Sequence, residues 1–153
     1  MPIPQQVKLL GSSLDSVKDL YEKHQLNPDN NGVRPIDHVL SYSLEHRSLC
    51  KGDLYTIRPF GSDMLYRLRI KDFEDVVLTS TTMLLLADSG VWGSIADGQL
   101  FRGAKIGFYL DNELVFKSIL DVTEAPVSCL HYSLGVPQRQ NYVLCNGLVV
   151  KSD

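Results

Sequence analysis

Short apolar runs separated by turn-forming residues constrain this chain of 153 residues more than any other feature. From Val33 onward the runs are IDHVLSYSL, DLYTIRP, LYRLRI, DVVLTS, MLLLAD, KIGFYL, ELVFKSI, VSCLHYSL, NYVLC and LVV. Turn formers such as FGSD, DSG, DNE and NG lie between them. The pattern predicts a mainly β domain of about ten short strands, folded as a sandwich or a strongly coiled sheet system. The Asn-Gly turn between the last two runs predicts a closing hairpin.

The first thirty or so residues differ from this β pattern. The segment SSLDSVKDLYEKHQL places its apolar residues at helical spacing, and Ser12 and Asp15 occupy the positions of an N-cap and its reciprocal third residue. The turn formers NPDNNG, residues 27–32, then end the helical pattern. The sequence therefore predicts a helical leader and turn over residues 1–31 and a β domain over residues 32–153.

Charge and hydropathy limit the classes of partner. The chain carries 15 Lys and Arg against 18 Asp and Glu, so it lacks the basic field that nucleic-acid backbones attract. No stretch approaches the roughly 18 consecutive apolar residues of a membrane span, and no secretory signal is apparent. We expect neither nucleic acid nor membrane as partner, and an intracellular, cytoplasmic protein. If the chain is a fragment, its ends carry no information on targeting.

Cysteine and histidine spacing gives no metal or cofactor site. The cysteines, Cys50, Cys129 and Cys145, are too widely spaced for a disulfide framework or a paired zinc site. The four histidines form no metal-binding pair, and no glycine-rich phosphate loop is present. We therefore expect reduced thiols, no metal and no cofactor.

The pair Cys129 and His131 is the best local candidate for nucleophilic catalysis. The two residues are two positions apart on an expected strand, so their side chains share one face. An imidazole beside a thiol can accept the thiol proton and activate the sulfur as a nucleophile. Such pairs often arise by chance on strands, where a cysteine is more commonly a small buried hydrophobe.

Three segments, in this order, resemble the Hint fold shared by inteins and the autoprocessing domain of hedgehog proteins. The first is LEHRSLCKGDLYTI (residues 44–57), in which Gly52 and Asp53 turn into a strand. The second is VVLTSTTMLLLADSGVWGSIADGQLFRGAKI (residues 76–106), and the third is VSCLHYSLGVPQRQNYVLCNGLVVKSD (residues 127–153). The resemblance implies a coiled β-fold of pseudo-twofold character, with the two chain ends close together at a cleft.

The resemblance also implies a chemistry, acyl transfer at a peptide bond, for which this chain lacks several groups. In the family a Thr-x-x-His pair polarises the bond and protonates the leaving nitrogen, and in inteins a terminal Asn cyclises. Thr79 matches the family threonine, but Thr82 stands at the histidine, and a hydroxyl cannot replace imidazole as acid or base. A second family histidine falls at Gln140, and the final His-Asn falls at Lys151 and Ser152.

The family's nucleophile positions lead to two functional hypotheses. Counting back from Gly52 places the leading nucleophile near residues 30–32, where no Cys, Ser or Thr occurs. The first hypothesis is a Hint-like β-domain that has lost splicing and serves as a structural or protein-interaction module, with a protein as partner. The second is an atypical autoprocessing domain with Cys129 as nucleophile, His131 as base and Thr79 as polarising residue, because some inteins use a cysteine at the place of Cys129. A third explanation is a chance resemblance in a small β-domain that binds a peptide along a sheet edge.

Overall fold

The computed structural model describes residues 6–8, 14–16, 35, 37–62, 65–87, 89–125, 129–144 and 146–152. The strands in these ranges are β1 (Gln6–Lys8), β2 (Leu14–Ser16), β3 (Asp37–Ser43), β4 (Ser48–Leu54), β5 (Thr56–Ser62), β6 (Leu65–Ile70), β7 (Val76–Leu78), β8 (Leu84–Ala87), β9 (Val91–Gly93), β10 (Lys105–Leu110), β11 (Glu113–Ala125), β12 (Cys129–Gly135), β13 (Asn141–Val143) and β14 (Val149–Lys151). Within the same ranges, no helical segment has the length and hydropathy to span a membrane.

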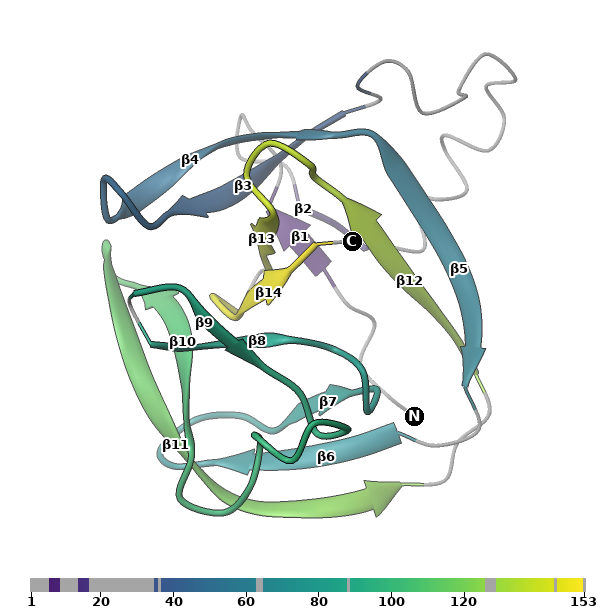
Figure 1. Cartoon of the computed structure of the whole chain (residues 1–153), viewed down its shortest axis with the longest axis vertical. Helices are drawn as coiled ribbons and strands as arrows, with labels where there is room; N and C mark the ends of the chain where they lie inside the picture. Colours follow the sequence, from purple (N-terminus) through teal and green to yellow (C-terminus); the bar gives the residue numbers. More distant parts are fainter. Residues whose placement is uncertain are drawn as a thin grey trace.

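All the strand pairs in the described part of the chain are antiparallel. They form two four-stranded sheets, β10-β11-β6-β7 and β13-β14-β8-β9, and three two-stranded pairs, β1-β2, β3-β4 and β5-β12. In Figure 1 the pairs β3-β4, β5-β12 and β6-β11 lie along the perimeter, and β8, β13 and β14 lie between them. The prediction of a mainly β, strongly coiled fold is confirmed.

The beginning of the predicted N-terminal helix is a strand. Leu14–Ser16 forms β2 and pairs with β1, Val7 lying opposite Asp15, and β1 also lies beside β3 and β13. Helix propensity over a few residues contributes only tenths of a kcal/mol each, which pairing with a neighbouring strand outweighs. The helix prediction is therefore wrong for these three residues. Residues 17–26 and the boundary predicted at residue 31 lie outside the described residues.

The buried side chains form two clusters. The larger cluster is centred on Phe108, and Leu68, Ile70 and Ile119 are among its members. The smaller cluster contains Tyr42, Leu85, Val143 and Val149, with Trp92 packed against it. Burying an aliphatic or aromatic side chain contributes about 1.5 to 3 kcal/mol, so the two clusters stabilise the contacts between sheets that hydrogen bonds alone do not connect.

The closing hairpin joins β13, which ends at Val143, to β14, which begins at Val149. Leu144 N–H donates to Leu148 O at 2.9 Å, and Gly147 N–H donates to Leu144 O at 2.9 Å. Asn146 Oδ1 accepts from Leu148 N–H at 3.0 Å. Gly147 has a φ of 91°, a left-handed value that glycine adopts without strain. The predicted hairpin is present, and Gly147 is the residue that lets the chain turn.

Gly52 and Asp53 do not turn into a strand, as the first matching segment predicts, but lie within β4, opposite Val39 and His38. A Cβ at Gly52 would overlap Ser41 Oγ and lie 3.0 Å from Val136 Cγ1. Glycine is needed here because a neighbouring strand and a loop approach it closely, and sequence spacing does not reveal that approach.

Candidate functional site

Five of the residues matched to the family's reactive positions come from segments that meet near the start of β8. Residues 79–83 connect β7 to β8, and β14 pairs with β8 through Val150 and Leu84. Lys151 N–H donates to Met83 O at 3.0 Å, and Ser152 N–H donates to Gln140 O at 2.9 Å. We call Thr79, Thr82, Gln140, Lys151 and Ser152 the chain-end cluster.

Ser152 is held by its hydroxyl as well as by its backbone. Its Oγ donates to Val136 O at 3.3 Å, and Gln140 N–H donates to the same carbonyl at 2.7 Å. Gln140 adopts a left-handed φ of 62°, which closes the loop over residues 136–140. The loop thereby presents the carbonyl groups of Val136 and Gln140 to Ser152. The Ser152 hydroxyl therefore serves to fix the end of β14 against residues 136–140.

Thr79 and Thr82 face one another across the turn before β8. Thr79 is only 6% exposed, and its Oγ1 lies 2.8 Å from Thr82 Oγ1 and 3.4 Å from Thr81 Oγ1. A hydroxyl can donate one hydrogen bond and accept others. It does not exchange a proton near neutral pH as an imidazole does. The pair can orient a carbonyl but is a poor proton donor to a leaving nitrogen.

Two histidine side chains that the structure describes lie on the β3-β4 hairpin. His38 Nδ1 lies 3.0 Å from Asp53 Oδ1, and His46 Nε2 lies 4.0 Å from Glu45 Oε2 on an exposed turn. In the described residues no group of three His, Cys, Asp or Glu side chains could hold a metal ion. Each of these two histidines therefore lies beside a carboxylate on the β3-β4 hairpin.

Cys129 and His131 are the first and third residues of β12. Their Cα partners on β5 are Ser62 and Phe60, and Figure 1 shows β12 running beside β5. The backbone therefore has the strand spacing on which the candidate pair depends. Their side chains are outside what the structure describes, and the pairing of thiol with imidazole stays a prediction.

Asn141 is a structural residue of the site that sequence reasoning missed. It is 2% exposed, and its Oδ1 accepts from Tyr42 N–H at 2.7 Å. Its Nδ2 donates to Tyr42 O at 2.9 Å and to Arg139 O at 3.1 Å. The side-chain amide of Asn141 thus makes the two hydrogen bonds to Tyr42 on β3 that a peptide group of a neighbouring strand would make. Its main-chain carbonyl also accepts from Ser41 Oγ at 2.7 Å.

Cys50 lies close to the same hairpin but is a poor nucleophile. Its Sγ donates to Ser41 O at 3.5 Å, and the described part of the chain gives it no disulfide partner. Burial raises the pKa of the Cys50 thiol, and the nearby Arg139 guanidinium opposes this effect only in part. The thiol form therefore predominates near neutral pH.

The strands form a coiled antiparallel arrangement in which β14 pairs with β8. This arrangement defines a Hint-like fold, and solved inteins share it. The PabCDC21-1 intein superimposes with a TM-score of 0.82 at 17% identity, over 99% of this chain and 97% of that chain. The KlbA intein precursor from Methanococcus jannaschii gives 0.79 at 12% identity, over 100% and 90%. The DnaB intein from Synechocystis sp. PCC 6803 gives 0.76 at 18% identity, over 98% and 95%.

No family model and no curated protein matches the sequence. At these low identities the structural likeness shows the fold: this chain has the intein fold. The predicted resemblance is confirmed at that level, and the explanation by chance resemblance is wrong.

Proposed function

We propose that this chain is an intein-fold domain that does not splice and that serves as a protein-interaction module. The observation that carries the proposal is the chemistry of the chain-end cluster. The Ser152 hydroxyl donates to Val136 O at 3.3 Å, and the Thr79 and Thr82 hydroxyls lie 2.8 Å apart. Each of these groups has a structural partner within the fold.

Acyl transfer needs a nucleophile, an acid for the leaving nitrogen and donors for the developing oxyanion. The cluster supplies hydroxyls, the Gln140 amide and the Lys151 ammonium, and no imidazole or carboxylate. Ser152 carries no side-chain amide that could cyclise. We therefore infer that the scaffold persists without the acid and the cyclising group that splicing requires.

The second candidate function is autoprocessing by Cys129, with His131 as base and Thr79 as polarising residue. The strand spacing of Cys129 and His131 on β12 and the burial of Thr79 favour it. Its chemistry would form a thioester between Cys129 and an acyl group of the chain, with a backbone nitrogen as leaving group. Such a thioester is cleaved by hydroxylamine or dithiothreitol.

Intact-mass spectrometry of the purified chain separates the two functions. We expect a single unchanged mass after prolonged incubation alone, with hydroxylamine and with dithiothreitol. The Cys129→Ala variant, incubated alongside, should behave identically. Fragments that form in the original chain and vanish in Cys129→Ala would instead establish autoprocessing.

The interaction role is an inference by elimination, since fold alone does not fix function. A reducing, cytoplasmic setting is part of the proposal. The free thiol of Cys50 is consistent with it. The partner would be a protein.

A further inference from the structure

The outer face of the sheet β10-β11-β6-β7 concentrates positive charge. On β6, Leu68 and Ile70 point inward and are buried, while Arg67 and Arg69 alternate with them and are exposed. Lys71, next along the chain, is also exposed, as are Arg102 and Lys105. We call these five cations the cationic face.

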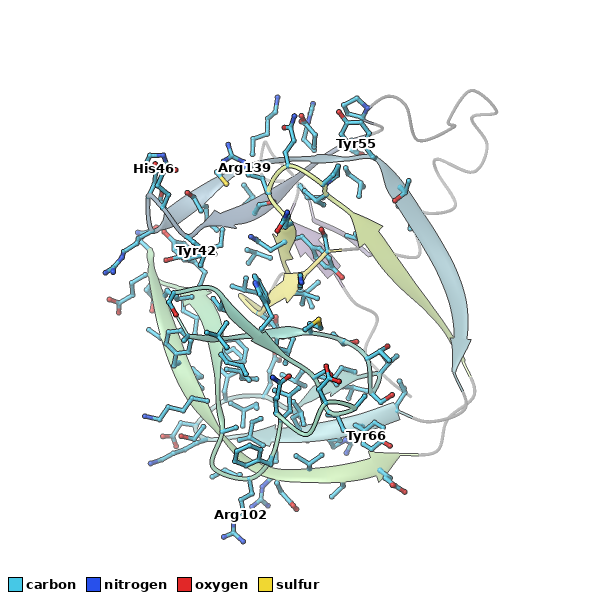
Figure 2. All side chains as sticks on the ribbon, viewed as in Figure 1. Tyr42, His46, Tyr55, Tyr66, Arg102 and Arg139 are labelled. Atoms are coloured by element: carbon cyan, nitrogen blue, oxygen red, sulfur yellow. The ribbon has the colours of Figure 1, made fainter. Side chains whose placement is uncertain are left out.

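Backbone pairing brings two of the lysines into one row across three strands. Lys105 on β10 lies opposite Ser118 on β11, and Lys71 N–H donates to Ser118 O at 3.0 Å from the other side. Arg102 lies in the turn before β10, and Figure 2 shows its side chain directed away from the fold. The face therefore extends along β6 and across the end of the sheet.

The five cations are available for a partner. Among the described residues, none of them forms an ion pair; the pairs present involve His38, His46 and Lys51. Asp121 lies opposite Arg69, but its Oδ1 accepts from Val122 N–H at 3.0 Å. The other nearby carboxylates are Asp72, Glu74 and Asp75 in the β6–β7 turn and Glu124 on β11, which lies opposite Tyr66. Five of the chain's 15 Lys and Arg thus gather on one face of a molecule whose net charge is -3.

Phe101 gives the turn that carries Arg102 an exposed apolar side chain. It is 56% exposed in a turn closed by Ala104 N–H donating to Phe101 O at 2.9 Å. Gly103 N–H donates to Ile119 O, and Ile119 N–H donates to Ala104 O, each at 2.8 Å. Because the turn is already fixed to β11, binding through Phe101 would cost little additional ordering. Exposed aromatic and arginine side chains are the types that dominate interface energies.

We propose that the cationic face and Phe101 dock an extended acidic segment of a partner protein. This inference rests on the proposed interaction role and gives it a surface and a partner chemistry. Alternate residues of a strand are about 6.8 Å apart, so Arg67, Arg69 and Lys71 match acidic side chains at every second position of an extended peptide. The Asp121 carboxylate within the face disfavours a continuous phosphate backbone.

Fluorescence anisotropy with a labelled peptide tests this inference. The probe alternates glutamate and threonine over about twelve residues, with one central leucine. We expect saturable binding that weakens with salt, and at least about tenfold weaker binding in the double variant Arg67→Glu, Arg69→Glu. Phe101→Ala should weaken binding severalfold while leaving the salt dependence unchanged.

A second double variant, Lys51→Glu, Arg139→Glu, is the matched control because it changes the net charge equally from the β4 side. It should retain binding to within about twofold. Absence of peptide binding, equal losses in both double variants, or tighter binding of a single-stranded oligonucleotide would each overturn the docking surface. Intact mass, measured on the same preparations, tests splicing activity separately. Failure of the docking surface therefore appears in the anisotropy alone, and failure of the proposed loss of splicing appears in the intact mass.

Discussion

Replacing Gly147 with alanine is expected to lower the free energy of unfolding by roughly 2 to 5 kcal/mol. Two costs add at this position. The left-handed φ of 91° costs an L-residue about 1 to 2 kcal/mol. An added Cβ would lie 2.6 Å from Tyr109 O, and overpacking of this kind costs about 1 to 3 kcal/mol. For a chain of this length the melting temperature should fall by about 10 °C.

Gly98→Ala provides the matched control for Gly147→Ala. Gly98 also has a positive φ, 72°, but a Cβ there meets nothing within 4 Å. Only the backbone cost of about 1 to 2 kcal/mol should remain. Urea unfolding of both variants measures the difference. Equal losses would mean that the Gly147 contact with β10, made by Tyr109 N–H donating to Gly147 O at 2.7 Å, does not hold the closing hairpin in place.

Replacing Asn141 with leucine is expected to destabilise the fold by a similar roughly 3 to 5 kcal/mol. Leucine has the same number and branching of side-chain heavy atoms as asparagine, but it leaves Tyr42 N–H, Tyr42 O and Arg139 O without the partners they have now. Each buried peptide group without a hydrogen bond costs about 1 to 3 kcal/mol. Chemical unfolding should show the loss as a lower midpoint at an unchanged slope.

Two variants show whether the hydrogen bonds of Asn141 are responsible. Asn141→Asp keeps the acceptor for Tyr42 N–H but loses both donors, and a protonated carboxyl restores one of them. Its destabilisation should therefore shrink as the pH falls. Gln138→Leu removes an amide from an exposed loop position and should change stability by less than about 0.5 kcal/mol. If Asn141→Leu were as mild as Gln138→Leu, the amide would not connect β3 to β13.

Local sequence patterns predict much of the β architecture. Alternation of apolar and charged residues in LYRLRI places Arg67 and Arg69 outside and Leu68 and Ile70 inside, as the structure has them. Turn formers of DSG and DNE and the Asn-Gly pair lie between strands as expected, but the expected FGSD turn is wrong for Phe60, Gly61 and Ser62, which lie within β5 and pair with β12. The features predicted correctly depend on neighbours in sequence, which is why spacing alone predicts them.

The features that the sequence does not predict depend on distant partners. Asn141 and Tyr42 are 99 residues apart, and nothing near Asn141 indicates that its amide will replace a strand. Leu14–Ser16 fits the spacing of a helix, yet its pairing with β1 decides its conformation. The family resemblance predicts the members of the chain-end cluster, whereas residue spacing alone does not predict that Lys151 N–H donates to Met83 O.

Placing this chain between two folded reporter domains shows whether it splices. After expression and purification, denaturing gels and mass spectrometry measure whether the fusion stays intact. With hydroxyls at Thr79 and Thr82 and the Ser152 hydroxyl bonded to Val136 O, we predict one full-length fusion at all times. Reporters ligated to each other with the chain excised would show that the scaffold splices and would contradict the account.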